Sequence, residues 1–160
     1  MLPTDMFLNV VDATPLVAID LVIENDEGSY LLGRRVNRPA QGFWFVPGGR
    51  IRKNEHLDDA FRRIAREELG LTDLKRADAD LLGIYEHLYE DNFSGRSGIS
   101  THYVVLGYKL RGAIELERLP DLQHAAYRWA TKEEITADAE VHLNTQAYFS
   151  DRENHQARNG

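Results

Sequence analysis

The segment GGRIRKNEHLDDAFRRIAREELG, residues 48–70, determines how the rest of the sequence is interpreted. A pair of glycines opens it, a charged turn follows, and the remainder has the apolar spacing of an amphipathic helix. Asn54 is a candidate N-cap and Gly70 a candidate C-cap for a helix that runs from about Glu55 to Leu69. The segment therefore predicts a glycine turn joined within a few residues to one long helix.

Glu68 is the unusual residue of this helix. At about 100° per residue it projects into the middle of the apolar face, whereas Glu67 lies at the edge of that face, on the same side as Arg63. An ionised carboxylate on a buried face is costly without a partner, and a helix C-terminus disfavours negative charge. The wheel alone favours a salt bridge to Arg63 or Arg50, or a frayed helix end; the other interpretation is a metal ligand. The apolar face consists of Leu57, Ala60, Phe61, Ile64 and Ala65.

The glycine turn that precedes the helix favours the metal interpretation. Glycines let backbone carbonyls approach a ligand closely. A carbonyl oxygen combined with a carboxylate oxygen suits a hard cation such as Mg²⁺ or Mn²⁺. The turn and Glu68 can therefore share one cation site.

Composition limits the class of protein. The 160 residues fit one domain, spanning residues 1–160, with 42% hydrophobic and 28% charged residues. The net charge is −7 and Lys and Arg form no block, which argues against nucleic acid or an anionic membrane as the main partner. The chain contains no Cys, which excludes disulfides and thiolate sites. No signal segment or membrane span is recognisable, so we expect a cytoplasmic protein.

The order of expected elements is a mixed α/β pattern. Strands are predicted at 15–24, 29–35, 43–46, 81–90, 101–110 and 127–130, with loops at 37–42 and 91–98. Short helical segments are predicted from about 133 and over 141–151, and the polar end is expected to fray. These elements predict helices packed on a mixed or antiparallel sheet.

The glycine turn and helix resemble the Nudix box, the metal-binding motif of hydrolases that act on nucleoside diphosphates linked to another group. Ile64 departs from the pattern, because ordinary members place a metal-binding glutamate there. The positions that match the box are Gly49, Glu55, Arg63, Glu67, Glu68, Gly70 and Leu71.

Four further segments narrow the resemblance to the GDP-mannose mannosyl hydrolase branch of this family: RRVNRPAQGFWFVPGGR, YEDNFSG, THYVVLGY and LPDLQHAAYRW. The resemblance implies a Nudix α/β/α sandwich and a homodimer. It implies hydrolysis of GDP-mannose or GDP-glucose to GDP and free sugar, with water attacking the anomeric carbon with inversion. That branch also lacks part of the acidic set, and such chemistry needs help for the leaving diphosphate more than a metal-activated nucleophile.

The resemblance also implies the metal ligands and the base. It places Mg²⁺, or Mn²⁺, on the carbonyl of Gly48, on Glu68 and on Gln123. It makes His124 the general base, since a neutral imidazole can accept a proton from water at neutral pH. Without the resemblance, a loop histidine is more often a surface residue.

The resemblance assigns the substrate contacts as well. Arg35 and Arg50 match positions that contact the diphosphate or leaving group, and Arg38 is a weaker candidate. Tyr103 and His87 could donate to a phosphate, although they could instead be wall residues of amphipathic strands. Asp20 is expected to bind sugar hydroxyls and to stabilise positive charge, or otherwise to pair with an arginine. The catalytic set implied is thus Asp20, Arg35, Arg50, Tyr103 and His124.

The guanine ring needs an aromatic surface, for which Phe7, Phe43 and Tyr89 are candidates, while Trp44 and Trp129 are expected in the core. Two other functions stay open. One is an ordinary Nudix pyrophosphohydrolase that cleaves a P–O bond, because Glu67 and Glu68 are both present. The other is a non-catalytic module that binds nucleotide sugars.

Overall fold

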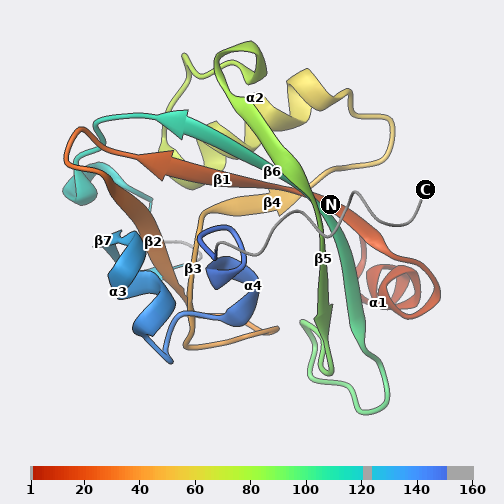
Figure 1. Ribbon diagram of the computed structural model, residues 1–160. Helices are drawn as coiled ribbons and strands as arrows, with labels where there is room; N and C mark the ends of the chain where they lie inside the picture. The colour runs from red at the N-terminus through yellow and green to blue at the C-terminus, as the bar shows by residue number, and fades with distance from the viewer. Residues whose placement is uncertain (1, 121–123, 151–160) are drawn as a thin grey trace, which may run out of the picture.

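The computed structural model describes residues 2–120 and 124–150 (Figure 1). No helix within these two ranges is long and apolar enough to cross a membrane. The elements in chain order are α1 (Thr4–Ala13), β1 (Leu16–Glu24), β2 (Ser29–Arg35), β3 (Trp44–Phe45), β4 (Gly48–Arg50), α2 (Leu57–Leu69), the 3₁₀ turn η1 (Arg76–Asp78), β5 (Asp80–Tyr89), β6 (Thr101–Arg111), the 3₁₀ turn η2 (Leu116–Arg118), β7 (His124–Thr131), α3 (Lys132–Ala137) and α4 (Leu143–Gln146).

The described strands form one mixed sheet in the order β3-β2-β1-β6-β5, with β4 added to β1 and β7 added to β2. β1 and β6 run parallel, from Leu16 opposite Tyr103 to Glu24 opposite Arg111. The remaining pairings between named strands are antiparallel. The mixed sheet predicted from the sequence is therefore confirmed.

The sheet divides at β1. β2 is registered with β1 only at the hairpin end, where Glu24 faces Tyr30. Further along, β4 occupies the place beside β1, and Asp20 lies opposite Gly48. β2 pairs instead with β7 (Figure 1). The first residue of β7, His124, lies opposite Arg35. Polar residues of β1, β2 and β7 are thereby brought to the same region of the sheet.

Hydrophobic clusters cover both faces of the sheet. The alternation of β1 directs Ile19, Leu21 and Ile23 to one face and Val22 to the other, as a strand requires. The first cluster packs on α2, and the second packs on α3 and the segment around α4. Each fully buried Leu, Ile or Phe contributes about 1.5–3 kcal/mol. The predicted α/β/α arrangement is therefore confirmed, with helices packed on both faces of the central sheet.

The start of α2 differs from the prediction. Asn54 does not cap the helix: its φ is 65°, and the helix begins at Leu57 after His56. Glu55 precedes the helix and accepts a hydrogen bond from the Arg52 backbone N–H at 2.9 Å. The prediction failed because Asn54 adopts the left-handed conformation, which asparagine tolerates, in the turn before the helix. Gly70 ends the helix in the left-handed conformation, as predicted.

Other elements also differ from expectation. α1 was not predicted, although it buries Leu8 and Val11. The glycines predicted as a turn belong to β4, which pairs with β1. The strand expected at 127–130 is longer, and the helix expected over 141–151 is limited to α4 followed by turns. Trp44 and Trp129 are half-buried against the two clusters. The expected fraying after residue 150 lies outside the described residues.

Candidate active site

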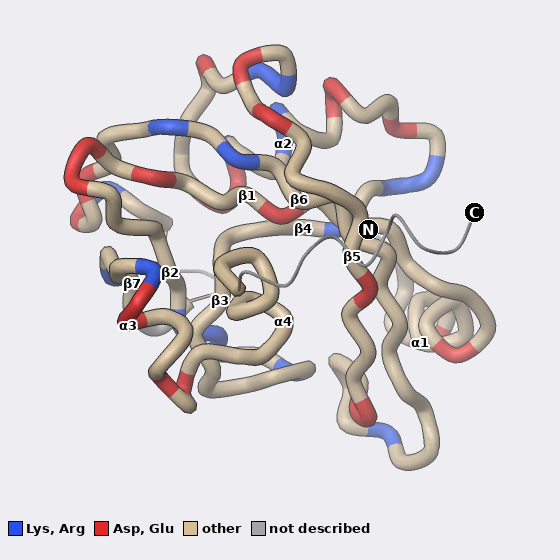
Figure 2. The backbone as a smooth tube through the Cα atoms, in the orientation of Figure 1, with Lys and Arg blue, Asp and Glu red and all other residues tan. Residues whose placement is uncertain are grey.

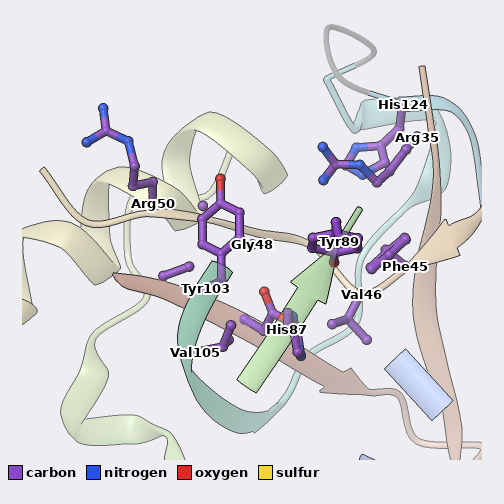
Figure 3. A pocket seen from close by; sticks show the side chains of 13 residues that line it. Arg35, Phe45, Val46, Gly48, Arg50, His87, Tyr89, Tyr103, Val105 and His124 are labelled. Carbon is purple, nitrogen blue, oxygen red and sulfur yellow. The ribbon is translucent and has the colours of Figure 1, made fainter. Parts of the chain in front are cut away.

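A cavity of about 120 Å³ lies where β2 diverges from β1. Figure 3 shows Arg50 and Arg35 on opposite sides of it, with Tyr103 between them. The cavity brings together seven of the ten predicted site residues. These are Asp20, Arg35, Gly48, Arg50, His87, Tyr103 and His124; the other lining residues are Ala18, Phe45, Val46, Gly49, Tyr89 and Val105.

Asp20 and Gly48 are cross-strand neighbours in close contact. A Cβ atom on Gly48 would lie 2.2 Å from Oδ1 of Asp20 and 2.6 Å from the Ile19 carbonyl oxygen. Only glycine therefore fits between β4 and the carboxylate. Burial raises the pKa of Asp20 to about 7, against the opposing effects of a hydrogen bond from Tyr148 and the charge of Arg35.

Arg35 and His124 form the second cross-strand pair of the site. A bulge in the pairing between Arg34 and Arg35 precedes this pair. The imidazole of His124 packs on Gly33, where an added Cβ atom would lie 2.5 Å from Cδ2 of the ring. The guanidinium of Arg35 lies 5.6 Å from the centre of the Phe45 ring. Gly33 therefore leaves space for the His124 ring, and the Phe45 ring packs against the Arg35 guanidinium.

His87 and Tyr103 lie opposite each other on β5 and β6. His87 is 5% exposed, and its Nε2 atom has no hydrogen-bond partner within the described residues. Burial lowers the pKa of His87 to about 4, so the imidazole is neutral at physiological pH. The pKa of Tyr103 is raised, mainly by burial, so its hydroxyl keeps its proton. Both residues can donate a hydrogen bond to a ligand in the cavity.

Glu68 lies beside His124, on the apolar face predicted for α2. It is 5% exposed, and its Oε2 atom is 3.9 Å from Nδ1 of His124. Burial raises the pKa of Glu68 to about 7 and lowers the pKa of His124 to about 4; Arg35 opposes the first shift and reinforces the second. Because His124 is uncharged at neutral pH, this contact is not a salt bridge.

Arg63, a predicted salt-bridge partner of Glu68, is engaged elsewhere. Its guanidinium donates to Glu55 at 2.6 Å, to Glu67 at 3.0 Å and to the Arg50 carbonyl at 2.7 Å. Arg50 stacks on Phe7, 4.7 Å from the ring centre. The alternative of a salt bridge from Glu68 to Arg63 or Arg50 is therefore wrong, whereas the predicted proximity of Glu67 and Arg63 is confirmed. Arg63 therefore links residues 50–55, which follow the glycine pair, to α2 by hydrogen bonds.

Ile64, which replaces the expected acid, is a core residue. Its side chain is 1% exposed and packs in the cluster between α2 and the sheet. A Cβ atom on Gly49 would lie 3.1 Å from Cγ1 of Ile64. The isoleucine therefore fills the space beneath the glycine pair with hydrocarbon, and no carboxylate reaches the cavity from this position.

The predicted metal ligands offer oxygen donors only. Glu68 accepts no hydrogen bond from the described residues. A buried carboxylate without a donor is costly, and a bound cation would supply the missing partner. Gly48 lines the same cavity with its backbone. Gln123 lies outside the described residues, and within the described ranges no three His, Asp or Glu side chains converge on one point. The donor set thus fits a hard cation held by one carboxylate and neutral oxygens.

Arg38 lies apart from this cavity. It lines an adjacent, more open cleft together with Phe43, and Tyr89 lines both spaces. The third candidate for guanine stacking, Phe7, lies elsewhere: it packs under Arg50 and against Phe93, with ring centres 4.9 Å apart. The three candidates therefore do not form one surface. The structure adds Phe45 and Tyr148 to the surroundings of the site. Their spacing in the sequence carries no signal for this, since Tyr148 reaches Asp20 across 128 residues.

The three-layer fold and the glycine–helix segment beside an arginine-lined cavity define a Nudix hydrolase. The NUDIX domain family matches residues 14–151, and the chain belongs to this family. It is similar to the low-salt glycan biosynthesis protein Agl8 of Haloferax volcanii, 44% identical over 110 residues that cover 68% of this chain and 67% of Agl8. It is also 38% identical over 71 residues to the ADP-ribose pyrophosphatase of Methanocaldococcus jannaschii, of which the match spans 40%.

Solved structures share the fold. The MutT protein of Methanosarcina mazei superimposes with a TM-score of 0.67 and 20% identity, covering 86% of this chain and 92% of that chain. The MutT NUDIX hydrolase of Burkholderia pseudomallei gives a TM-score of 0.65 and 25% identity, over 85% and 96% of the two chains. The fold class predicted from the sequence is thereby confirmed.

Proposed function

We propose that the protein hydrolyses a GDP-sugar, GDP-mannose or GDP-glucose, to GDP and free sugar by attack of water at the anomeric carbon with inversion. The observation that carries the proposal is the burial of Ile64 beneath Gly49, so that position 64 offers no acid to the proposed cation site. Glu68 remains, next to a neutral histidine. This arrangement suits the departure of a diphosphate with a separate base for water.

The two arginines give the cavity its affinity for a diphosphate. Arg35 and Arg50 lie on opposite sides of the cavity, and guanidinium groups bind phosphate oxygens with parallel hydrogen bonds (Figure 3). Lys and Arg elsewhere are scattered among Asp and Glu rather than gathered on one element (Figure 2). The positive charge that matters for the ligand is therefore local, as a small phosphate ligand requires.

Mg²⁺, or Mn²⁺, would bind Glu68, the Gly48 carbonyl and Gln123. When bound there it supplies Lewis-acid stabilisation of the leaving diphosphate. Glu68 contributes the anionic ligand, and the proximity of Arg35 adds positive charge on the same side. Tyr103 and His87 donate hydrogen bonds into the cavity.

His124 is placed to act as the general base. The Tyr127 hydroxyl donates to the Pro120 carbonyl, so its oxygen can accept from Nδ1–H of His124 at 3.4 Å. This tautomer leaves Nε2 unprotonated. Since the ring is neutral down to about pH 4, Nε2 can accept a proton from water across the physiological range.

Asp20 faces the glycosyl end of the proposed substrate. The transition state at the anomeric carbon is oxocarbenium-like and carries positive charge. A carboxylate beside Arg35 and Gly48 is held in the same cavity and would stabilise that charge. The name of the similar Agl8 protein refers to glycan biosynthesis, which supports a sugar-linked nucleotide as substrate.

A second function, cleavage of a P–O bond, is favoured by the presence of both Glu67 and Glu68 and by the similarity to an ADP-ribose pyrophosphatase. Hydrolysis of GDP-mannose in ¹⁸O-water with Mg²⁺ separates the two. We expect label in the released sugar; label in a phosphate product would establish P–O cleavage instead. Absence of turnover with every nucleotide sugar would indicate a binding module.

We further propose a homodimer, which light scattering of the eluted protein would test.

A further inference from the structure

Tyr148, in the turn that follows α4, contacts Asp20 although 128 residues separate them in the chain. Its hydroxyl donates to Oδ2 of Asp20 at 2.7 Å. Within the described residues this is the side-chain hydrogen bond that Asp20 receives. The other charged or titratable groups near Asp20 act through space and are Arg35 on β2, Glu68 on α2, Tyr89 on β5 and Tyr103 on β6.

The ring of Tyr148 is seated by specific packing. It lies over Gly107, the residue of β6 registered with Asp20, where an added Cβ atom would be 2.8 Å from Cε1. The ring of Tyr85 packs edge-on with a centroid separation of 4.6 Å. A glycine and an aromatic neighbour therefore fix the position from which the hydroxyl reaches the carboxylate.

The backbone that carries Tyr148 is anchored on both sides of the residue. Thr145 is fully buried, and its hydroxyl accepts the Val46 backbone N–H at 3.2 Å, next to the cavity. Phe149 is 5% exposed and packs against Tyr30 with ring centres 4.6 Å apart. These anchors make the contact with Asp20 part of the fixed structure.

The two oxygens of Asp20 thus have different surroundings. Oδ2 accepts from Tyr148, whereas Oδ1 lies at Gly48, on the wall of the cavity. We propose that Tyr148 is a positioning residue: it holds Oδ2 of Asp20 so that Oδ1 faces the substrate beside Gly48. The proposal rests on the proposed function in so far as Oδ1 then faces the glycosyl group. Tyr148 itself does not touch the reacting atoms.

Kinetics of single and double variants test this role. We expect Tyr148→Phe to lower kcat/KM for GDP-mannose roughly 10- to 100-fold, the range expected for one hydrogen bond to a charged group. The inhibition constant of GDP should stay within about twofold, because the nucleotide contacts are unchanged. In an Asp20→Asn background, Tyr148→Phe should cause little further loss, since the oxygen it positions is already altered.

Tyr85→Phe is the matched control. It removes a phenolic hydroxyl from the same aromatic pair but leaves the hydrogen bond between Tyr148 and Asp20 in place. A control loss equal to that of Tyr148→Phe, or full additivity with Asp20→Asn, would overturn the proposal. Crystal structures of the wild type and Tyr148→Phe provide a test that does not need turnover. A rotated Asp20 carboxylate in the variant supports the proposal, and an unchanged one refutes it. Failure of the wild type to hydrolyse GDP-mannose would count against the proposed function alone.

Discussion

Nδ1 of His124 lies 3.9 Å from Oε2 of Glu68, and both side chains are 5% exposed. Burial shifts their pKa values in opposite directions, upward for the acid and downward for the base. Each group is therefore biased towards its uncharged form in the absence of a cation. A cation at Glu68 would favour the carboxylate and leave His124 neutral, which is the protonation state that the proposed reaction requires.

His124→Gln should lower kcat about 10²- to 10⁴-fold, the contribution of a general base, while GDP-mannose still binds. Steady-state kinetics and calorimetric titration with GDP-mannose measure the two effects separately. His56→Gln, at the start of α2, is the control and should retain wild-type kinetics. A His124→Gln variant with full rate would remove His124 from the mechanism.

Gly33→Ala should reproduce much of the His124 defect without altering the histidine. The added Cβ atom would lie 2.5 Å from Cδ2 of His124, so the ring or β2 must shift. Displacement of a catalytic group by about 1 Å can lower the rate about 100-fold. Gly112→Ala is the matched control, because its Cβ atom would meet Ile23 at an ordinary 3.5 Å. Equal kcat values for the two alanine variants would contradict the packing role of Gly33.

Ile64→Glu should destabilise the protein in EDTA by roughly 3 kcal/mol or more, because a carboxylate would enter the core between α2 and the sheet. Ile64→Val, which only shortens the side chain, should cost about 0.5–1.5 kcal/mol. Thermal unfolding with and without Mg²⁺ measures both. We expect Mg²⁺ to recover part of the loss in the glutamate variant alone. A glutamate variant as stable as the wild type in EDTA would show that position 64 has access to solvent.

The ionisation of Glu68 predicts how stability depends on pH without metal. Its pKa is about 7 in the folded protein against an ordinary value of 4.5, so the folded state retains a proton that the unfolded state releases. The stabilisation is complete below pH 4.5 and is lost as the pH rises to about 7.

Glu68→Gln removes this dependence, because an amide does not titrate. The free energy of unfolding, measured by urea titration in EDTA from pH 4.5 to 7.5, should therefore fall less steeply with pH in the variant than in the wild type. Parallel curves for the two proteins would mean that Glu68 ionises normally. The difference between the two curves reports mainly on Glu68, because both proteins retain Asp20 and His124.

The sequence predicted the elements whose signals are local. Alternating Val and Ile residues define β1, the apolar face of α2 includes Ile64 and Glu68, and Gly70 ends that helix. The resemblance contributed the seven predicted residues of the cavity, which lie on six strands and cannot be associated by spacing alone. Their catalytic roles remain predictions.

The features that could not be predicted depend on tertiary contacts. β4 is a strand because it pairs with the edge of β1 that is left unpaired where β2 departs. Without knowledge of that pairing, the two glycines of β4 predict a turn. The alternative of a salt bridge from Glu68 to Arg63 failed because Arg63 is held by Glu55, which lies eight residues away and before the helix begins. Tyr148 was missed because Gly107 and Tyr85, which seat it, lie in distant strands.

The parallel pairing of β1 with β6 has a kinetic consequence for how the enzyme matures. This ladder joins segments more than 80 residues apart, from Leu16 beside Tyr103 onward. Such a loop must close before the contacts it permits can form, which slows folding relative to hairpin-rich chains. During synthesis β1 cannot pair with β6 until residues 101–111 have been made, so Asp20 and Tyr103 come together only late. A shortened polypeptide ending before residue 101 would lack part of the cavity lining.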